Sequence, residues 1–119
     1  EISDKKISSN ENGSLYNLNM SCSINNEMMS KGNFSSMNWT FEQIIERISY
    51  GATIFPGDVI GSGTVGTGCL LELNGTGKRN NSNFHEKWLK EGDIIEMSIE
   101  GLGKISNKII KDNSNYQIK

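Results

Sequence analysis

Residues 16–26 read YNLNMSCSINN, and this stretch decides the first structural element of the chain. Apolar side chains alternate with asparagine and serine, and a period of two predicts a half-buried β-strand. The apolar positions are Tyr16, Leu18, Met20, Cys22 and Ile24. The Asn25-Asn26 pair predicts a turn, a strand over Glu27–Ser30 would return as its hairpin partner, and Lys31–Asn33 would turn the chain again.

One amphipathic helix is expected after this hairpin. Apolar residues recur at helical spacing between Met37 and Ile48. Thr40 followed by Gln43 matches a capping box at the start, and Gly51 supplies a stop at the end. We expect the apolar stripe of this helix to pack against the core, which is the ordinary role of such a stripe.

The rest of the chain is rich in strands and turns, so the predicted fold class is β-rich α+β. The expected strands are Val59-Ile60, Cys69–Leu73, Ile94–Glu100 and Lys104–Ile110. Glycine turns precede two of them, at Pro56-Gly57-Asp58 and Glu91-Gly92-Asp93. Residues 1–14 are expected to form a polar arm, residues 15–111 the domain, and residues 112–119 a polar tail.

Composition excludes several classes of protein. With 119 residues and a net charge of −2, the chain lacks the basic excess typical of nucleic-acid binding. No apolar run approaches a membrane span, and no signal-like segment opens the sequence, so a cytoplasmic location is expected. Cys22 and Cys69 are far apart and are expected to be free thiols rather than a disulfide or a metal site.

The glycine loop, defined here as residues 61–68, offers the clearest binding feature. Its first six residues, GSGTVG, match a dinucleotide fingerprint, but the strand expected after Gly68 argues against that ligand because the fingerprint requires a helix. The loop can still bring backbone N–H groups and the Thr64 hydroxyl to a small anion. The alternative is a flexible connection between strands.

Glu72 is a carboxylate among leucines, which requires a partner, a proton or a place on the solvent side of a strand. Strand alternation places it opposite Leu71 and Leu73, which favours an exposed face. His85 lies in the most polar stretch and is expected to be solvated. No His, Cys, Asp and Glu residues have the spacing of a metal site.

Five ordered motifs together give a more specific signal. Residues 15–111 resemble the C-terminal half of the catalytic domain of the fumarylacetoacetate hydrolase family. The motifs are NWTF at 38–41, PGDVIGSGTVG at 56–66, LLEL at 70–73 followed by Gly75-Thr76, WLKEGD at 88–93 and IEGLGKISNKI at 99–109.

This resemblance implies a β-rich roll on a mixed sheet, usually a homodimer, with Mg2+ or Ca2+ chelating a 1,3-diketo or 2-oxo acid. It implies that Thr64, with Gly63 and Gly66, contacts substrate, and that Glu72 orients a catalytic histidine so that water can attack a carbonyl. The reaction expected of the complete protein is hydrolysis of a C–C bond. Decarboxylation, hydration and isomerisation are alternatives within the family.

The family's metal ligands, catalytic histidine and lysine lie upstream of the matched part. The chain is therefore expected to be either a fragment, inactive without the missing N-terminal half of the domain, or a reduced homologue. The competing hypothesis is a non-catalytic β-rich module for assembly or binding.

Overall fold

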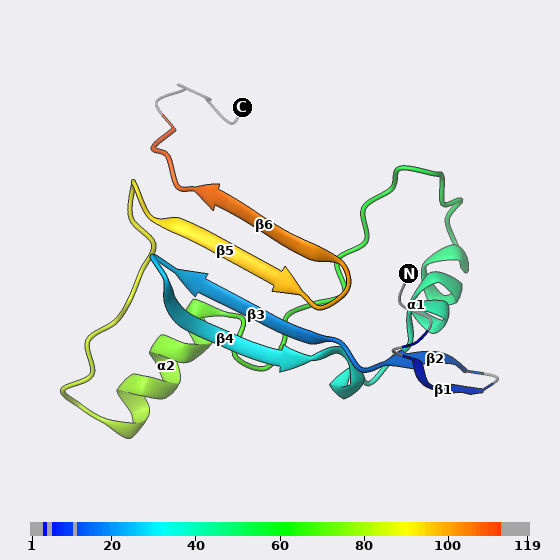
Figure 1. Ribbon diagram of the computed structural model, residues 1–119, viewed down its shortest axis with the longest axis horizontal. Helices are drawn as coiled ribbons and strands as arrows, with labels where there is room; N and C mark the ends of the chain where they lie inside the picture. The colour runs from blue at the N-terminus through cyan, green and yellow to red at the C-terminus, as the bar shows by residue number, and fades with distance from the viewer. Residues whose placement is uncertain (1–3, 5, 11, 113–119) are drawn as a thin grey trace.

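The computed structural model describes residues 4, 6–10 and 12–112, and it has the expected β-rich α+β fold. Strands β1 (Lys6–Asn10) and β2 (Gly13–Tyr16) form an antiparallel hairpin. Strands β3 (Asn19–Ile24), β4 (Glu27–Asn33), β5 (Ile94–Ile99) and β6 (Gly103–Lys108) form an antiparallel sheet in the order β4-β3-β5-β6 (Figure 1). Strand β1 lies within the segment predicted to be a polar arm, whereas residues 113–119 of the predicted tail lie outside the described part.

The β3–β4 hairpin confirms the turn predicted at Asn25-Asn26. Both asparagines have positive φ, 51° and 67°, which matches the twist that a two-residue hairpin requires. The long strand predicted from Tyr16 is divided in two, because β2 ends at Tyr16 and β3 begins at Asn19. Leu18 lies in the break and is buried, with 1% of its surface exposed.

Strand β4 is longer than predicted and runs through the expected turn at Lys31–Asn33. The chain turns one step later, in the short 3-10 helix η2 (Phe34–Ser36). The Asn33 side chain caps η2 by accepting hydrogen bonds from the Ser35 N–H, at 2.9 Å, and from the Ser35 hydroxyl, at 2.7 Å. This cap explains why asparagine ends the strand here.

Helix α1 (Phe41–Ser49) begins with the predicted capping box. The Gln43 N–H donates to the Thr40 hydroxyl, and the Thr40 N–H donates to the Gln43 side chain at 3.0 Å. Glu42 ties the helix to β2, since the Ser14 N–H donates to its carboxylate at 3.1 Å. The predicted core packing of the apolar stripe is wrong for this chain, because α1 contains no buried residue and Ile45 is half exposed.

Helix α2 (Leu70–Asn80) replaces the strand predicted at Cys69–Leu73 and continues through Gly75 and Gly77. The buried Asn74 side chain holds this helix in place. The Asn74 amide donates to the Lys87 carbonyl at 2.9 Å and accepts from the Lys87 N–H at 3.0 Å. Gly77 leaves room for the Phe84 ring, which a Cβ atom would approach within 2.5 Å.

The strand predicted at Val59-Ile60 is also wrong, because this segment is irregular and Val59 is almost fully exposed. The strands predicted at Ile94–Glu100 and Lys104–Ile110 are confirmed as β5 and β6, which pair as a hairpin with a turn at Gly101 and Leu102. Neither α1 nor α2 is long and apolar enough to cross a bilayer; this finding covers the described residues.

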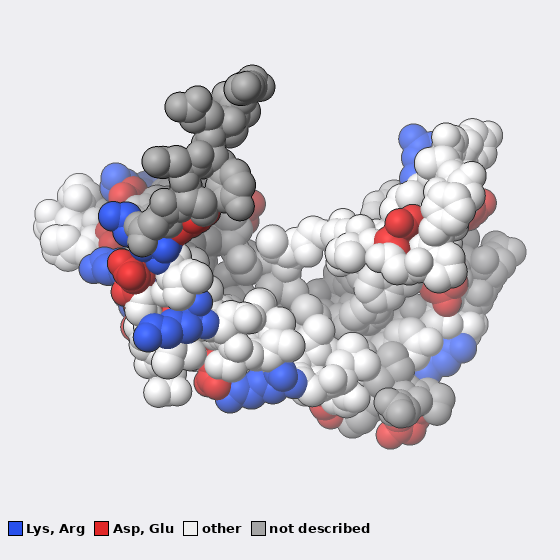
Figure 2. All heavy atoms as spheres, turned by 90° about the horizontal axis from the view of Figure 1, so that it is seen from above, with Lys and Arg blue, Asp and Glu red and all other residues white. Residues whose placement is uncertain are grey.

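The chain exposes far more surface than a compact protein of its mass. Its accessible area is 9721 Å2, whereas a folded monomer of 13.2 kDa exposes about 6,400 Å2. Its radius of gyration is 17.9 Å, against about 13.5 Å for a compact domain of this length. Among the described residues, Leu18 is the one fully buried hydrophobic side chain. Viewed from above, the charged side chains lie mainly toward the two ends and the middle is largely uncharged (Figure 2).

Candidate functional site

The glycine loop lies against strand β4. The Ser30 and Thr67 hydroxyls are 2.8 Å apart, and Ser30 is buried. The Thr67 hydroxyl also donates to the Lys31 carbonyl at 3.3 Å. Gly32 permits the closest approach, since a Cβ atom there would lie 2.8 Å from Cγ1 of Val65. The loop is therefore anchored at its second half, while Gly63, with φ of 88°, turns the first half.

A pocket of about 450 Å3 opens beside this loop. Gly63, Thr64 and Gly66, the three positions predicted to contact substrate, all line it. The opposite walls come from β3, η2, α1 and the β5–β6 turn. Their lining residues are Met20, Asn33, Phe34, Ser36, Met37, Asn38, Trp39, Phe41, Ile44, Ile99 and Leu102. The structure thus brings the NWTF motif, the glycine loop and the closing strands together.

Sequence reasoning missed most of this wall. Asn38 and Trp39 belong to the NWTF motif, which carries no predicted site residue, yet both line the pocket beside the loop. Phe34 gave no signal of its own, yet its ring packs between Phe41, at a centroid distance of 5.2 Å, and Tyr16, at 5.8 Å. The one sequence feature that points to Phe34 is its position between the end of the strand pattern and the start of the helical pattern.

Glu72 does not line the pocket. It lies in the first turn of α2 and is exposed to solvent. The prediction that it orients a histidine is not tested by this chain alone. His85 is exposed, as expected for a solvated loop residue.

Cys22 and Cys69 are both free and partly buried in the structure. Among the residues that the structure describes, no three His, Cys, Asp or Glu side chains are grouped so that they could hold a metal ion. This part of the chain therefore does not fit the Mg2+ or Ca2+ that the family resemblance implies.

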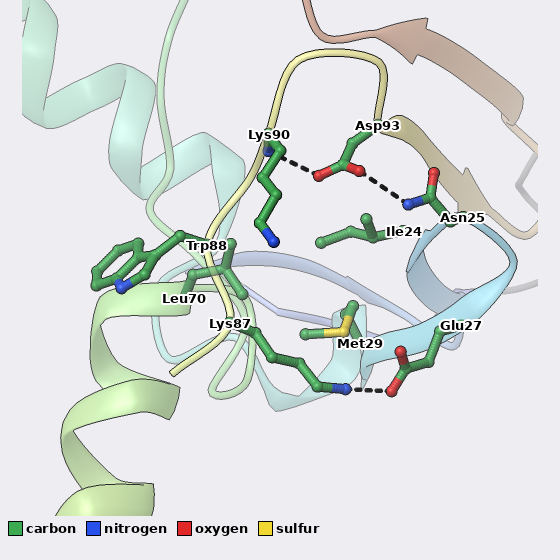
Figure 3. Close-up of a pocket in the computed structure, with 9 residues that line it drawn as sticks. All are labelled: Ile24, Asn25, Glu27, Met29, Leu70, Lys87, Trp88, Lys90 and Asp93. Carbon is green, nitrogen blue, oxygen red and sulfur yellow. Dashed lines mark hydrogen bonds and ion pairs between the residues drawn. The ribbon is translucent and has the colours of Figure 1, made fainter. Parts of the chain in front are cut away.

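A second, smaller pocket of about 220 Å3 lies at the other end of β3, beside the β3–β4 turn (Figure 3). Lys87 pairs there with Glu27, and the Asp93 carboxylate accepts from the Asn25 amide at 2.9 Å and from the Lys90 N–H at 2.7 Å. These bonds, the one from Asn25 first, lower the pKa of Asp93. No predicted site residue lines this pocket, so it is distinct from the pocket at the glycine loop.

The comparisons with known proteins agree with the arrangement of motifs. The family model described as fumarylacetoacetate (FAA) hydrolase C-terminal matches residues 3–110. The chain belongs to the fumarylacetoacetate hydrolase family. This membership also explains why the glycine loop and the closing strands occur in this order.

Three relatives illustrate the range of the family. The mitochondrial oxaloacetate tautomerase FAHD2B of Bos taurus is 32% identical over 80% of this chain and 27% of its own length. The mitochondrial oxaloacetate tautomerase FAHD2A of Homo sapiens is 33% identical over the same shares. An uncharacterized protein of Methanocaldococcus jannaschii is 31% identical over 78% of this chain and 32% of its own length. The chain thus spans about a third or less of these relatives.

Proposed function

We propose that this chain forms one wall of the active site of an enzyme that acts on a small 2-oxo or 1,3-diketo acid. The observation that carries the proposal is the pocket in which Gly63, Thr64 and Gly66 face the residues of the NWTF motif. Backbone N–H groups of a glycine-rich turn and a threonine hydroxyl are suitable donors to a carboxylate or carbonyl oxygen.

The names of the relatives favour tautomerisation, in which a proton moves between the carbon beside the carbonyl and the carbonyl oxygen. Hydrolysis of a C–C bond in a 1,3-diketo acid is the second candidate within the family. Both reactions develop negative charge on the carbonyl oxygen, so donors from the glycine loop would serve either of them. Only hydrolysis also requires an attacking water.

Glu72 is proposed as a positioning residue for a histidine contributed by polypeptide outside these residues. Its place in the first turn of α2 leaves the carboxylate open to such a partner. In this arrangement the carboxylate would accept from one imidazole nitrogen and leave the other to handle the proton.

The test is turnover in the complete polypeptide. Turnover of oxaloacetate is measured by enol absorbance, and turnover of an acylpyruvate is measured by acid release. Thr64→Val and Glu72→Gln are each expected to lower kcat/KM by about 100-fold, the typical effect of losing one catalytic donor or base. Thr76→Val and Glu91→Gln are matched controls, because both residues are exposed and outside the pocket. Unchanged turnover in Thr64→Val would contradict the proposed role of the loop.

An assembly role is the competing function, and the large exposed surface favours it. We propose that further polypeptide of the domain, together with a second copy, covers Ile45 and Ile48, the exposed apolar side chains of α1 that lie outside the pocket. Native mass spectrometry of the chain alone and of the complete polypeptide tests this. A monomeric complete polypeptide that still turns over substrate would contradict the role of the second copy.

A further inference from the structure

We infer that the pocket beside the glycine loop takes a 2-oxo acid that has a single carboxylate and an apolar tail, rather than a short dicarboxylate. The inference rests on the proposed function and specifies its substrate class. Three features of the pocket support it: the neutral character of its donors, the nature of its other walls, and its size.

The donors that line the pocket are all uncharged, and those opposite the loop are partly engaged. No hydrogen bond within the described part of the chain engages the Thr64 hydroxyl, which therefore remains available at the loop. On the opposite side, the Asn33 amide already donates to Asn17 at 2.8 Å and to Asn19 at 3.1 Å. Ser36 is also engaged, since its hydroxyl donates to the Asn33 carbonyl at 2.8 Å. One carboxylate can be bound at the loop, whereas a second on the opposite side would meet only the neutral N–H groups of Asn38 and Trp39 and no cation.

The remaining walls are mostly apolar and carry no charge among the described lining residues. The apolar members are Met20, Phe34, Met37, Trp39, Phe41, Ile44, Val65, Ile99 and Leu102. A carboxylate held against these walls would lose its water without gaining a cation, which is strongly unfavourable. An alkyl or aryl group in the same place gains free energy from the apolar area that it buries.

The size of the pocket agrees with this reading. Its volume of about 450 Å3 falls in the range of roughly 300–1,000 Å3 typical of pockets for small organic ligands. The Phe34 ring is held between two other aromatic rings, so this wall is fixed and does not depend on a single mobile side chain. An oxo acid of four carbons would leave much of this apolar space unfilled.

Binding to the 119-residue chain tests the inference through tryptophan fluorescence. The Trp88→Phe variant leaves Trp39, which lines the pocket, as the one tryptophan. Three probes are titrated: 2-oxooctanoate, oxaloacetate and octanol. We expect 2-oxooctanoate to bind at least about tenfold more tightly than oxaloacetate, because its tail buries several methylene groups.

The other outcomes separate the inference from the proposed function. Oxaloacetate binding as tightly as 2-oxooctanoate overturns the inference and leaves the proposed function standing. Octanol binding as tightly as 2-oxooctanoate shows that the carboxylate contributes nothing to affinity. This result contradicts the role of the glycine loop in the inference and in the proposed function alike. Absence of binding by all three probes overturns the inference.

A charge-gain variant checks the location. Leu102→Arg adds a cation to the apolar wall at the β5–β6 turn and is expected to raise affinity for oxaloacetate about tenfold relative to 2-oxooctanoate. Ile105→Arg is the matched control, because Ile105 is a similarly exposed apolar residue on β6 outside the pocket. Equal effects of the two variants would show that the ligand does not bind at this wall.

Discussion

Replacing Gly32 with alanine tests how the glycine loop is held against β4. A methyl group on Gly32 would lie 2.8 Å from Cγ1 and 3.0 Å from Cβ of Val65. Favourable carbon contacts lie at about 3.5–4.0 Å, so either the strand or the loop must move. Overpacking of this kind costs about 1–3 kcal/mol, from which the lower entropy of the unfolded alanine variant subtracts about 0.4–1 kcal/mol.

The decisive measurement is a double-mutant cycle by urea unfolding followed by circular dichroism. Val65→Ala removes both γ carbons, so it should relieve most of the conflict. We expect Gly32→Ala to lower the free energy of unfolding by about 1–2 kcal/mol, and the double variant to be more stable than additivity predicts by at least about 0.5 kcal/mol. Gly51→Ala is the control, because nothing lies within 4 Å of a Cβ atom there. Additive effects, or equal effects of Gly32→Ala and Gly51→Ala, would refute the packing of the loop on the strand.

Three further predictions concern single contacts. Thr40→Ala removes the helix cap and should lower the free energy of unfolding by about 1 kcal/mol in urea titrations, whereas Thr53→Ala, at an exposed irregular position, should not. Ser30→Ala removes the partner of the loop hydroxyl, so amide hydrogen exchange in residues 64–68 should accelerate while exchange in β5 stays unchanged. The hydrogen bond from the Asn25 amide is the main cause of the lowered pKa of Asp93. The ionised carboxylate therefore stabilises the fold above pH 3.8, the pKa in the unfolded chain, and this stabilisation is lost as the pH falls through the lower pKa of the folded chain. In Asp93→Asn the free energy of unfolding should therefore fall less steeply at acid pH. An unchanged slope would contradict the role of Asp93 in this pH dependence.

The elements predicted correctly from sequence are those whose cause is local. Asn25-Asn26 sets the β3–β4 turn through its own backbone preference, and Thr40 with Gln43 sets the start of α1. Gly92, with φ of 94°, makes the turn before β5. In each case the residues that determine the structure lie within four positions of one another.

Helix α2 could not be predicted in this way, because its causes lie farther along the chain. Short apolar runs such as LLEL suit a strand or a helix equally well, and Gly75 and Gly77 are read as turn residues. In the structure, Asn74 bonds to Lys87 and Gly77 makes room for Phe84, so tertiary contacts sustain a helix that the local sequence disfavours. The helix also changes the reason for rejecting a dinucleotide site: the irregular residues 59–60 and the antiparallel sheet lack the strand that the fingerprint needs.

The candidate site was predictable in its loop and not in its walls. The glycines and Thr64 are recognisable as a string, because they are adjacent in sequence. Phe34, Ile99 and Leu102 meet them only through the order of strands in the sheet, which no local pattern specifies. The same limit applies to Glu72. Its exposed face is predicted from the alternation of a strand, but in the structure the residue lies in helix α2.

The two outer strands of the four-stranded sheet differ in a way that bears on self-association. The Thr67 hydroxyl donates to the Lys31 carbonyl on β4, so another strand cannot pair along the full length of that edge. Strand β6 is exposed at every residue and has Lys104 and Lys108 near its ends, positive charges that discourage edge-to-edge pairing with a copy of itself. Because only one rim is open, strand addition between copies would stop at a pair and could not propagate into a fibre.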